Sequence, residues 1–226
     1  MPAKAVITRD LFKFLRELQD NNNREWFLAN KQRYEELVRD PFLDFIESLA
    51  PGLHRIDPDI VVDSRPAGGS MMRIYRDIRF SKDKTPYKTR VAAHFVAEAK
   101  GGGPLPGYYV SFGPGGSRTG AGIWHPESDA LRKIRDAIVK DPKAWLKATS
   151  AKQLGDTALG GESLSRPPRG YARDHPLIRD LMRTDFMVGA TLQERDVLSP
   201  KLKDIVLENY RKMSAMVEFL ARALGH

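Results

Sequence analysis

Residues 107–125, GYYVSFGPGGSRTGAGIWH, contain the pattern that decides the expected fold. Two short runs, 107–112 and 119–125, are rich in aromatic, β-branched and small residues, and the Gly113-Pro114-Gly115-Gly116 segment between them is typical of a tight turn. A third run of this kind, residues 90–97, precedes them. Because no helical pattern lies between the three runs, they predict strands that pair in an antiparallel sheet.

The two-residue periodicity extends toward the N-terminus. Residues 59–65 and 71–81 also have the pattern of strands, with Ala67-Gly68-Gly69 as the turn between them. Residues 186–192 have the composition of a sixth strand. The sequence therefore predicts a mostly antiparallel sheet of five to six strands.

Helical periodicity occurs before and after the predicted sheet. In the N-terminal part, Leu11, Leu15 and Leu18 form a helical stripe, Asn23 is a suitable N-cap, and Pro51-Gly52 is expected to end the third helix. Residues 150–175 are rich in glycine and proline and are expected to form a long loop. The expected helices cover residues 8–20, from 24 onward, 40–51, 127–140, 142–146, 176–183 and 199–224.

Together these elements predict one α+β domain over residues 1–226. It is expected to be helical in 8–50, to form the sheet in 59–125, and to be helical again in 127–224. A chain of this length can bury a sizeable core without disulfide bonds.

Composition excludes several classes of protein. The chain has no cysteine, which excludes a disulfide framework and a thiolate metal site. No apolar run approaches the ~18–20 residues of a membrane span, and the first residues lack the apolar core of a signal peptide. We therefore expect a cytoplasmic protein with no membrane partner. The five histidines lack metal-binding spacing, so each is expected to be structural and no metal is expected. No pattern indicates a cofactor or an oligomeric state.

The positive charge is concentrated in one segment. The whole chain carries a net charge of +8, and residues 73–90 hold seven basic and two acidic residues, a net of +5. Such a concentration favours an anionic partner.

The expected strand 71–81 would divide this charge between two faces. Arg76 then shares a face with Ile74 and Ile78, which are expected to face the core. Because an unpaired guanidinium is costly in a core, Arg76 is expected to be buried against a carboxylate, for which Glu25 is the first choice. The opposite face would carry Met71, Arg73, Tyr75, Asp77, Arg79 and Ser81.

Two guanidiniums around one carboxylate, followed by a lysine-rich loop, are typical of a site for phosphate or carboxylate groups. In this hypothesis Arg73 and Arg79 flank Asp77, and Tyr87 either stacks on a base or sugar or anchors the loop. The expected ligand-binding residues are Arg24, Arg73, Arg76, Arg79, Lys82, Lys84, Tyr87 and Lys88.

Three functions are compatible with this pattern. The first is binding of a phosphate-bearing anionic ligand, such as a phosphorylated small molecule, with nucleic acid as a further candidate partner. The second is an enzyme that acts on a phosphorylated or carboxylated small molecule, with Asp77 or Asp83 as the base or as a metal ligand. The third is an ion-pair network that holds the sheet to the first helices and binds no ligand.

Five blocks of sequence occur in order along the chain. They are NNNREWF at 21–27, RDIRFSKDKTPYK at 76–88, GYYVSFGPG at 107–115, GAGIWHP at 120–126 and RPPRGYARDHP at 166–176. Together they resemble the hallmarks of one bacterial and fungal family of conserved hypothetical proteins. The resemblance implies a single domain of this length, and it implies no activity, cofactor or catalytic residue. The hallmark positions of the first two blocks are Asn22, Asn23, Arg24, Glu25, Trp26, Arg76, Asp77, Arg79, Phe80, Ser81, Asp83, Lys84, Pro86, Tyr87 and Lys88.

Overall fold

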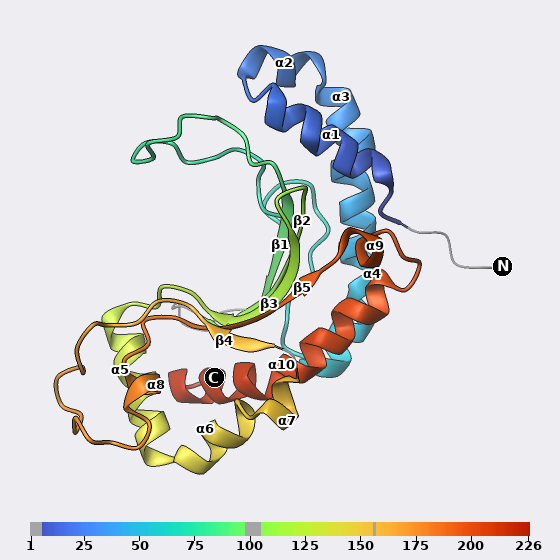
Figure 1. Ribbon diagram of the computed structural model, residues 1–226. Helices are drawn as coiled ribbons and strands as arrows, with labels where there is room; N and C mark the ends of the chain where they lie inside the picture. Colours follow the sequence, from blue (N-terminus) through green and yellow to red (C-terminus); the bar gives the residue numbers. More distant parts are fainter. Residues whose placement is uncertain (1–5, 98–104, 156) are drawn as a thin grey trace. The chain divides into compact units, whose positions relative to one another are not determined.

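The computed structural model describes residues 6–97, 105–155 and 157–226 (Figure 1). The chain forms two compact units, and both contain parts of the same strands. Unit 1 comprises Met1–Phe95, Tyr109–Thr119 and Thr191–Glu208, and unit 2 comprises Val96–Tyr108, Gly120–Ala190 and Asn209–His226.

An antiparallel sheet with helices before and after it in the sequence makes the protein α+β, as predicted. The order of the strands in the sheet is β1-β2-β3-β5-β4. The strands are β1 (Val91–Val96), β2 (Gly107–Phe112), β3 (Ser117–Ile123), β4 (Ala158–Gly160) and β5 (Phe186–Leu192). Predicted and observed bounds agree for β2 and β5, whereas the short edge strand β4 lies within the expected long loop.

Unit 1 begins with helices whose apolar stripes form its core. The buried side of α1 (Arg9–Asp20) consists of Leu11, Phe12, Phe14, Leu15 and Leu18. Asn23 caps α2 (Arg24–Ala29), because its side chain accepts a hydrogen bond from the N–H of Trp26, at 2.9 Å. The other helices of this unit are α3 (Lys31–Tyr34), the π-helix η1 (Glu35–Arg39), α4 (Asp40–Ile56) and α9 (Glu194–Val197).

Unit 2 contains α5 (Ser128–Lys140), α6 (Pro142–Ala148), α7 (Ala151–Leu154) and α8 (Ile178–Leu181), while α10 (Leu202–Leu224) has residues in both units. The core of unit 2 is built around Trp145, which is fully buried and contacts Phe186 edge-on, with ring centroids 5.7 Å apart. At Gly122 the backbone has φ +123°, and a Cβ there would overlap the carbonyl of Phe186. Only glycine therefore permits this approach of β3 to β5.

Two sequence predictions were wrong for physical reasons that the structure shows. The predicted strands 59–65 and 71–81 are absent, and within these described residues only isolated bridges form, such as Met71 with Ala93. Helix α4 does not end at Pro51 but continues to Ile56, because the burial of Gly52 and Leu53 offsets the loss of the hydrogen bond that proline removes.

Within the described ranges, no helix combines the length and apolarity that a membrane span requires.

Candidate functional site

The basic segment forms an irregular hairpin rather than a strand. Its backbone first bonds to β1, where the N–H of Met72 donates to the carbonyl of Ala92 at 2.8 Å. It then bonds to itself, through Arg76 N–H to Pro86 O at 2.9 Å and Lys88 N–H to Ile74 O at 2.8 Å. Because the chain changes its pairing partner between these points, no continuous ladder forms. We call residues 74–88 the basic hairpin; in Figure 1 it lies within the green segment to the left of α1 and α2.

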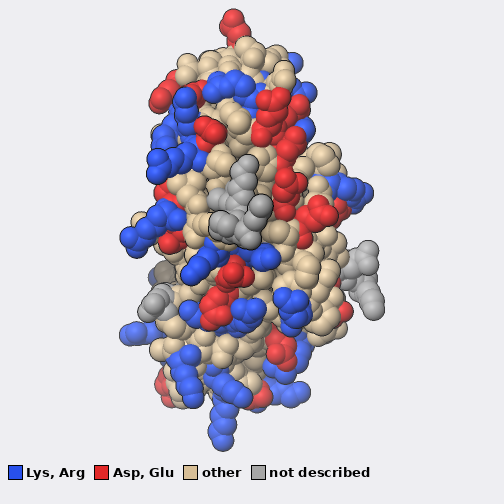
Figure 2. Space-filling model, turned by 90° about the vertical axis from the view of Figure 1, so that its right-hand side faces the viewer, with Lys and Arg blue, Asp and Glu red and all other residues tan. Residues whose placement is uncertain are grey.

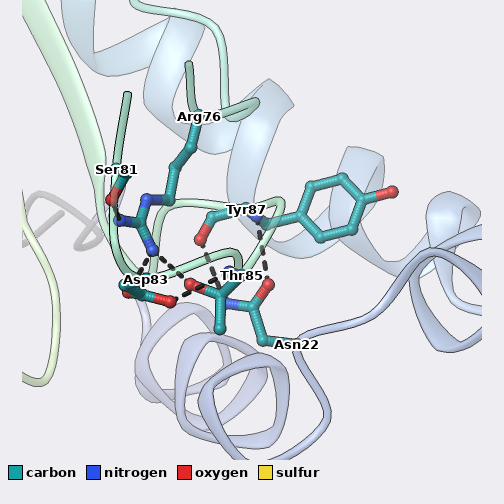
Figure 3. Close-up of polar contacts among 6 residues, drawn as sticks. All are labelled: Asn22, Arg76, Ser81, Asp83, Thr85 and Tyr87. Carbon is teal, nitrogen blue, oxygen red and sulfur yellow. Dashed lines mark hydrogen bonds and ion pairs between the residues drawn. The ribbon is translucent and has the colours of Figure 1, made fainter. Parts of the chain in front are cut away.

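Arg76 organises the loop of the basic hairpin from the inside. Its guanidinium donates hydrogen bonds to the carboxylate of Asp83 and to the hydroxyl of Thr85, and it lies 3.4 Å from the hydroxyl oxygen of Ser81 (Figure 3). The other carboxylate oxygen of Asp83 accepts the N–H of Thr85 at 2.9 Å. The side chains of one short loop therefore satisfy one another, and Arg76 acts as its internal support.

The partner expected for Arg76 from the sequence was wrong. Glu25 is exposed, and the carboxylate that Arg76 binds is Asp83, which lies within the same loop. The Arg76 side chain is 25% exposed and that of Asp83 is 58% exposed, so the pair is not the buried ion pair that was expected. Of the neighbours assigned to the core face, Ile74 is buried but Ile78 is only half-buried.

Asn22, just before α2, anchors the other end of the hairpin. Its amide nitrogen donates to the carbonyl of Tyr87, and its amide oxygen accepts the N–H of Tyr87, both at 3.0 Å. The Tyr87 ring points away from the Arg76 network in Figure 3 and stacks on Phe27, with centroids 4.1 Å apart. Since this ring is buried, it anchors the loop, which is one of the two roles expected for it.

Five other basic residues of the predicted set fall into two groups. Arg79 forms an exposed ion pair with Asp77 at 2.6 Å, and Lys84 donates to the carbonyl of Ile78 at 3.0 Å. Arg24, Arg73 and Lys82 are exposed. Their side chains have no ion pair to any acidic residue within the described ranges.

A cavity of about 440 Å³ opens beside the Arg76 network. It is lined by Gln19, Asn22, Arg76, Asp83, Thr85, Tyr87, Lys88, Thr89 and Arg90. The structure therefore brings together Arg76, Tyr87 and Lys88 from the predicted set, and it leaves the other predicted ligand residues outside this lining. We call this space the basic cavity.

Gln19, Thr89 and Arg90 line the cavity but were not among the site residues predicted from the sequence. The charge count of residues 73–90 contained the signal for Arg90, since Arg90 is its last cation. Gln19 lies in α1, far away in the sequence, and no local pattern points to it.

Lys88 and Arg90 give the cavity positive charge that no carboxylate neutralises among the described residues. The Lys88 ammonium donates to the carbonyl of Arg73 at 2.9 Å, and Arg90 is exposed. Burial lowers the pKa of Lys88, and the neighbouring charges of Arg90 and Arg73 lower it further. An anion in the cavity would relieve this repulsion.

The two carboxylates expected as catalytic candidates are held in their ionised form. Hydrogen bonds from the Thr85 N–H and then from Arg76 lower the pKa of Asp83 to about 2, and the Arg79 guanidinium lowers the pKa of Asp77. Carboxylates held so acidic are poor general bases at neutral pH. The described ranges contain no group of three or more histidine or acidic residues that could hold a metal ion.

The sequence of residues 10–219 matches the model of a family described as conserved hypothetical protein, DUF2461. The chain belongs to this family. No match was found among curated proteins. Membership agrees with the resemblance seen in the sequence blocks, and the basic hairpin and its cavity lie within the matched residues of this DUF2461 protein.

Proposed function

We propose that this DUF2461 protein binds a phosphate-bearing small molecule in the basic cavity. The observation that carries the proposal is the presence of Lys88 and Arg90 at a concave polar site where neither has a carboxylate partner of its own among the described residues. The one acidic residue of the lining, Asp83, is already engaged by Arg76. Guanidinium, ammonium, hydroxyl and amide donors around one space match the oxygens of a phosphate group.

The size of the site supports a small ligand. A volume of about 440 Å³ lies within the ~300–1,000 Å³ typical of small-molecule sites. Arg76 and Thr85 are fixed by their own hydrogen bonds, so the ligand would meet donors that are already in place.

Thermal shift and calorimetry with inorganic phosphate and pyrophosphate test the proposal. Phosphate binding at ~10 mM should raise the melting temperature by mass action. Replacing Arg90 with Gln or Lys88 with Gln should weaken binding about tenfold, since each loses a charge-assisted hydrogen bond. Arg79→Gln is the matched control, because Arg79 belongs to the same hairpin and does not line the cavity. Equal losses in all three variants, or no stabilisation of the native protein by either anion, would overturn the proposal.

Nucleic acid is the alternative anionic partner, and a second experiment must distinguish it from a phosphate-bearing small molecule. Figure 2 shows the right-hand side of Figure 1, on which basic and acidic side chains are interspersed, while the basic hairpin lies toward the left of Figure 1. Binding of labelled DNA and RNA, followed by fluorescence anisotropy at ~50 mM and ~200 mM salt, measures this directly. Micromolar binding that falls steeply with salt and survives Arg90→Gln would favour nucleic acid over a small ligand.

A further inference from the structure

A second constellation lies in unit 2, at the end of β3 and the start of β5. The carboxylate of Asp185 is 1% exposed. One of its oxygens accepts a hydrogen bond from the backbone N–H of His125 at 2.6 Å and lies 2.7 Å from Nδ1 of the same residue. Its other oxygen accepts the N–H of Glu162 at 2.9 Å. The buried carboxylate is thus fully engaged and holds the imidazole from one side.

His125 has a backbone conformation that side chains rarely adopt. Its φ is +47°, and it is the one non-glycine residue with positive φ in the described ranges. Such conformations persist where the surroundings impose them, and they concentrate at functional sites. Here the double hydrogen bond to Asp185 imposes it, since backbone and ring must reach the same oxygen.

The hydrogen bond also decides which ring nitrogen of His125 carries the proton. Burial alone would raise the pKa of Asp185, but the N–H groups of Glu162 and His125 outweigh burial and lower it. The ionised carboxylate can only accept, so Nδ1 must donate and the lone pair of the neutral ring lies on Nε2. The His125 side chain is 52% exposed, and Nε2 has no hydrogen-bond partner in the part of the chain that the structure describes.

The exposed indole of Trp124 lies directly beside the imidazole of His125. Trp124 is 71% exposed, and its indole stacks on the imidazole with centroids 4.4 Å apart and planes 22° apart. An indole offers an apolar face to flat rings. A proton acceptor and an aromatic platform therefore adjoin at one surface.

We propose that His125, positioned by Asp185, is a general base that activates water for hydrolysis of esters of aromatic alcohols, whose ring lies against Trp124. The water proton passes to Nε2 as the water oxygen bonds to the acyl carbon. The leaving oxygen departs with the electron pair of the broken C–O bond and takes the proton back from Nε2. Asp185 holds the ring orientation and balances the charge of the imidazolium that forms between these steps.

Hydrolysis of p-nitrophenyl acetate by the full chain tests the proposal. His125→Asn removes the base, and asparagine tolerates positive φ, so the fold should survive. We expect the rate above the solution background to fall at least about tenfold in this variant. The exposed His226 provides a matched control, and His226→Asn should retain the native rate. Native rates in His125→Asn would overturn the proposal.

Two further variants separate chemistry from structure. Trp124→Ala should raise KM with little change in kcat, because it removes only the platform. Asp185→Asn should lower kcat and move the proton of the neutral ring from Nδ1 toward Nε2, which nitrogen-15 NMR of the histidine rings detects. If the native protein shows Nε2 protonated in the neutral ring, the assigned tautomer is wrong and the proposal fails, even if Asp185→Asn does not fold.

Discussion

The side-chain amide of Asn22 pairs with the backbone of Tyr87 as a neighbouring strand would. Its nitrogen donates to the Tyr87 carbonyl, and its oxygen accepts the Tyr87 N–H. The side chain thereby completes the backbone hydrogen bonding of the hairpin at a point where no strand of the described residues pairs with it. Through this contact the turn before α2 and the basic hairpin are joined within unit 1.

The first prediction follows from this contact. Asn22→Ala should lower the free energy of unfolding by about 1–3 kcal/mol, because it leaves two backbone groups of Tyr87 without partners. Urea denaturation followed by circular dichroism measures the change. Asn21→Ala is the control, since Asn21 is exposed and, among the described residues, its side chain bonds only to the carbonyl of Glu17. Equal effects of the two substitutions would show that the hydrogen bonds to Tyr87 contribute no measurable stability.

Arg76 and Arg79 should differ in their contribution to stability. Arg76→Ala removes the centre of the loop network and should cost about 1–3 kcal/mol, as expected for hydrogen bonds to a charged group. This is less than for a fully buried ion pair, because water reaches both partners. Arg79→Ala should leave the thermal midpoint unchanged, since its ion pair with Asp77 is exposed. A larger loss from Arg79→Ala would contradict the structure of the hairpin.

The pH dependence of stability should reveal Asp83. Its folded-state pKa is lowered to about 2, so its contribution is fully present above its ordinary value of 3.8 and is lost as the pH falls through about 2. Asp83→Asn should therefore be less stable than the native protein at pH 5 to 7, and the two melting curves should converge as the pH approaches 2. A difference that stays constant over this range would mean that the carboxylate is not paired.

Gly122 tests the packing of β3 against β5. Gly122→Ala should destabilise the protein strongly, because the new Cβ would overlap the carbonyl of Phe186 and the backbone has positive φ. Gly115→Ala, at the turn before β3, has open space around its Cβ and should be close to neutral. Comparison of the two thermal midpoints checks the prediction, and a neutral Gly122→Ala would show that the strands can separate there.

Local periodicity predicted those elements that depend mainly on local residues. The stripe of α1 has a clear helical period, β2 and β5 have the composition of strands, and their observed bounds lie close to the predicted ones. Residues 71–81 also have the pattern of a strand, yet their backbone pairs with β1 for a few residues and then with Pro86 and Lys88. Pairing depends on a partner elsewhere in the chain, and no local pattern specifies where that partner changes.

In the candidate site too, local residues predicted one part and tertiary structure determined the rest. The charge of residues 73–90 predicted a candidate site in a segment that contributes to the lining of the basic cavity, but the faces assigned from a regular strand gave Arg76 the wrong partner. The pairing of Arg76 with Asp83 depends on how a short loop closes, and the contribution of Gln19 to the cavity depends on tertiary structure. Residue type alone predicts neither.

The hydrogen bonds within the basic hairpin also bear on how quickly a ligand would bind. Arg76, Asp83 and Thr85 fix the loop before any ligand arrives, and Asn22 fixes its end. Association with phosphate should then follow a single exponential whose rate rises linearly with concentration, without a slow conformational step. The residence time of the ligand, rather than its rate of arrival, would determine the affinity.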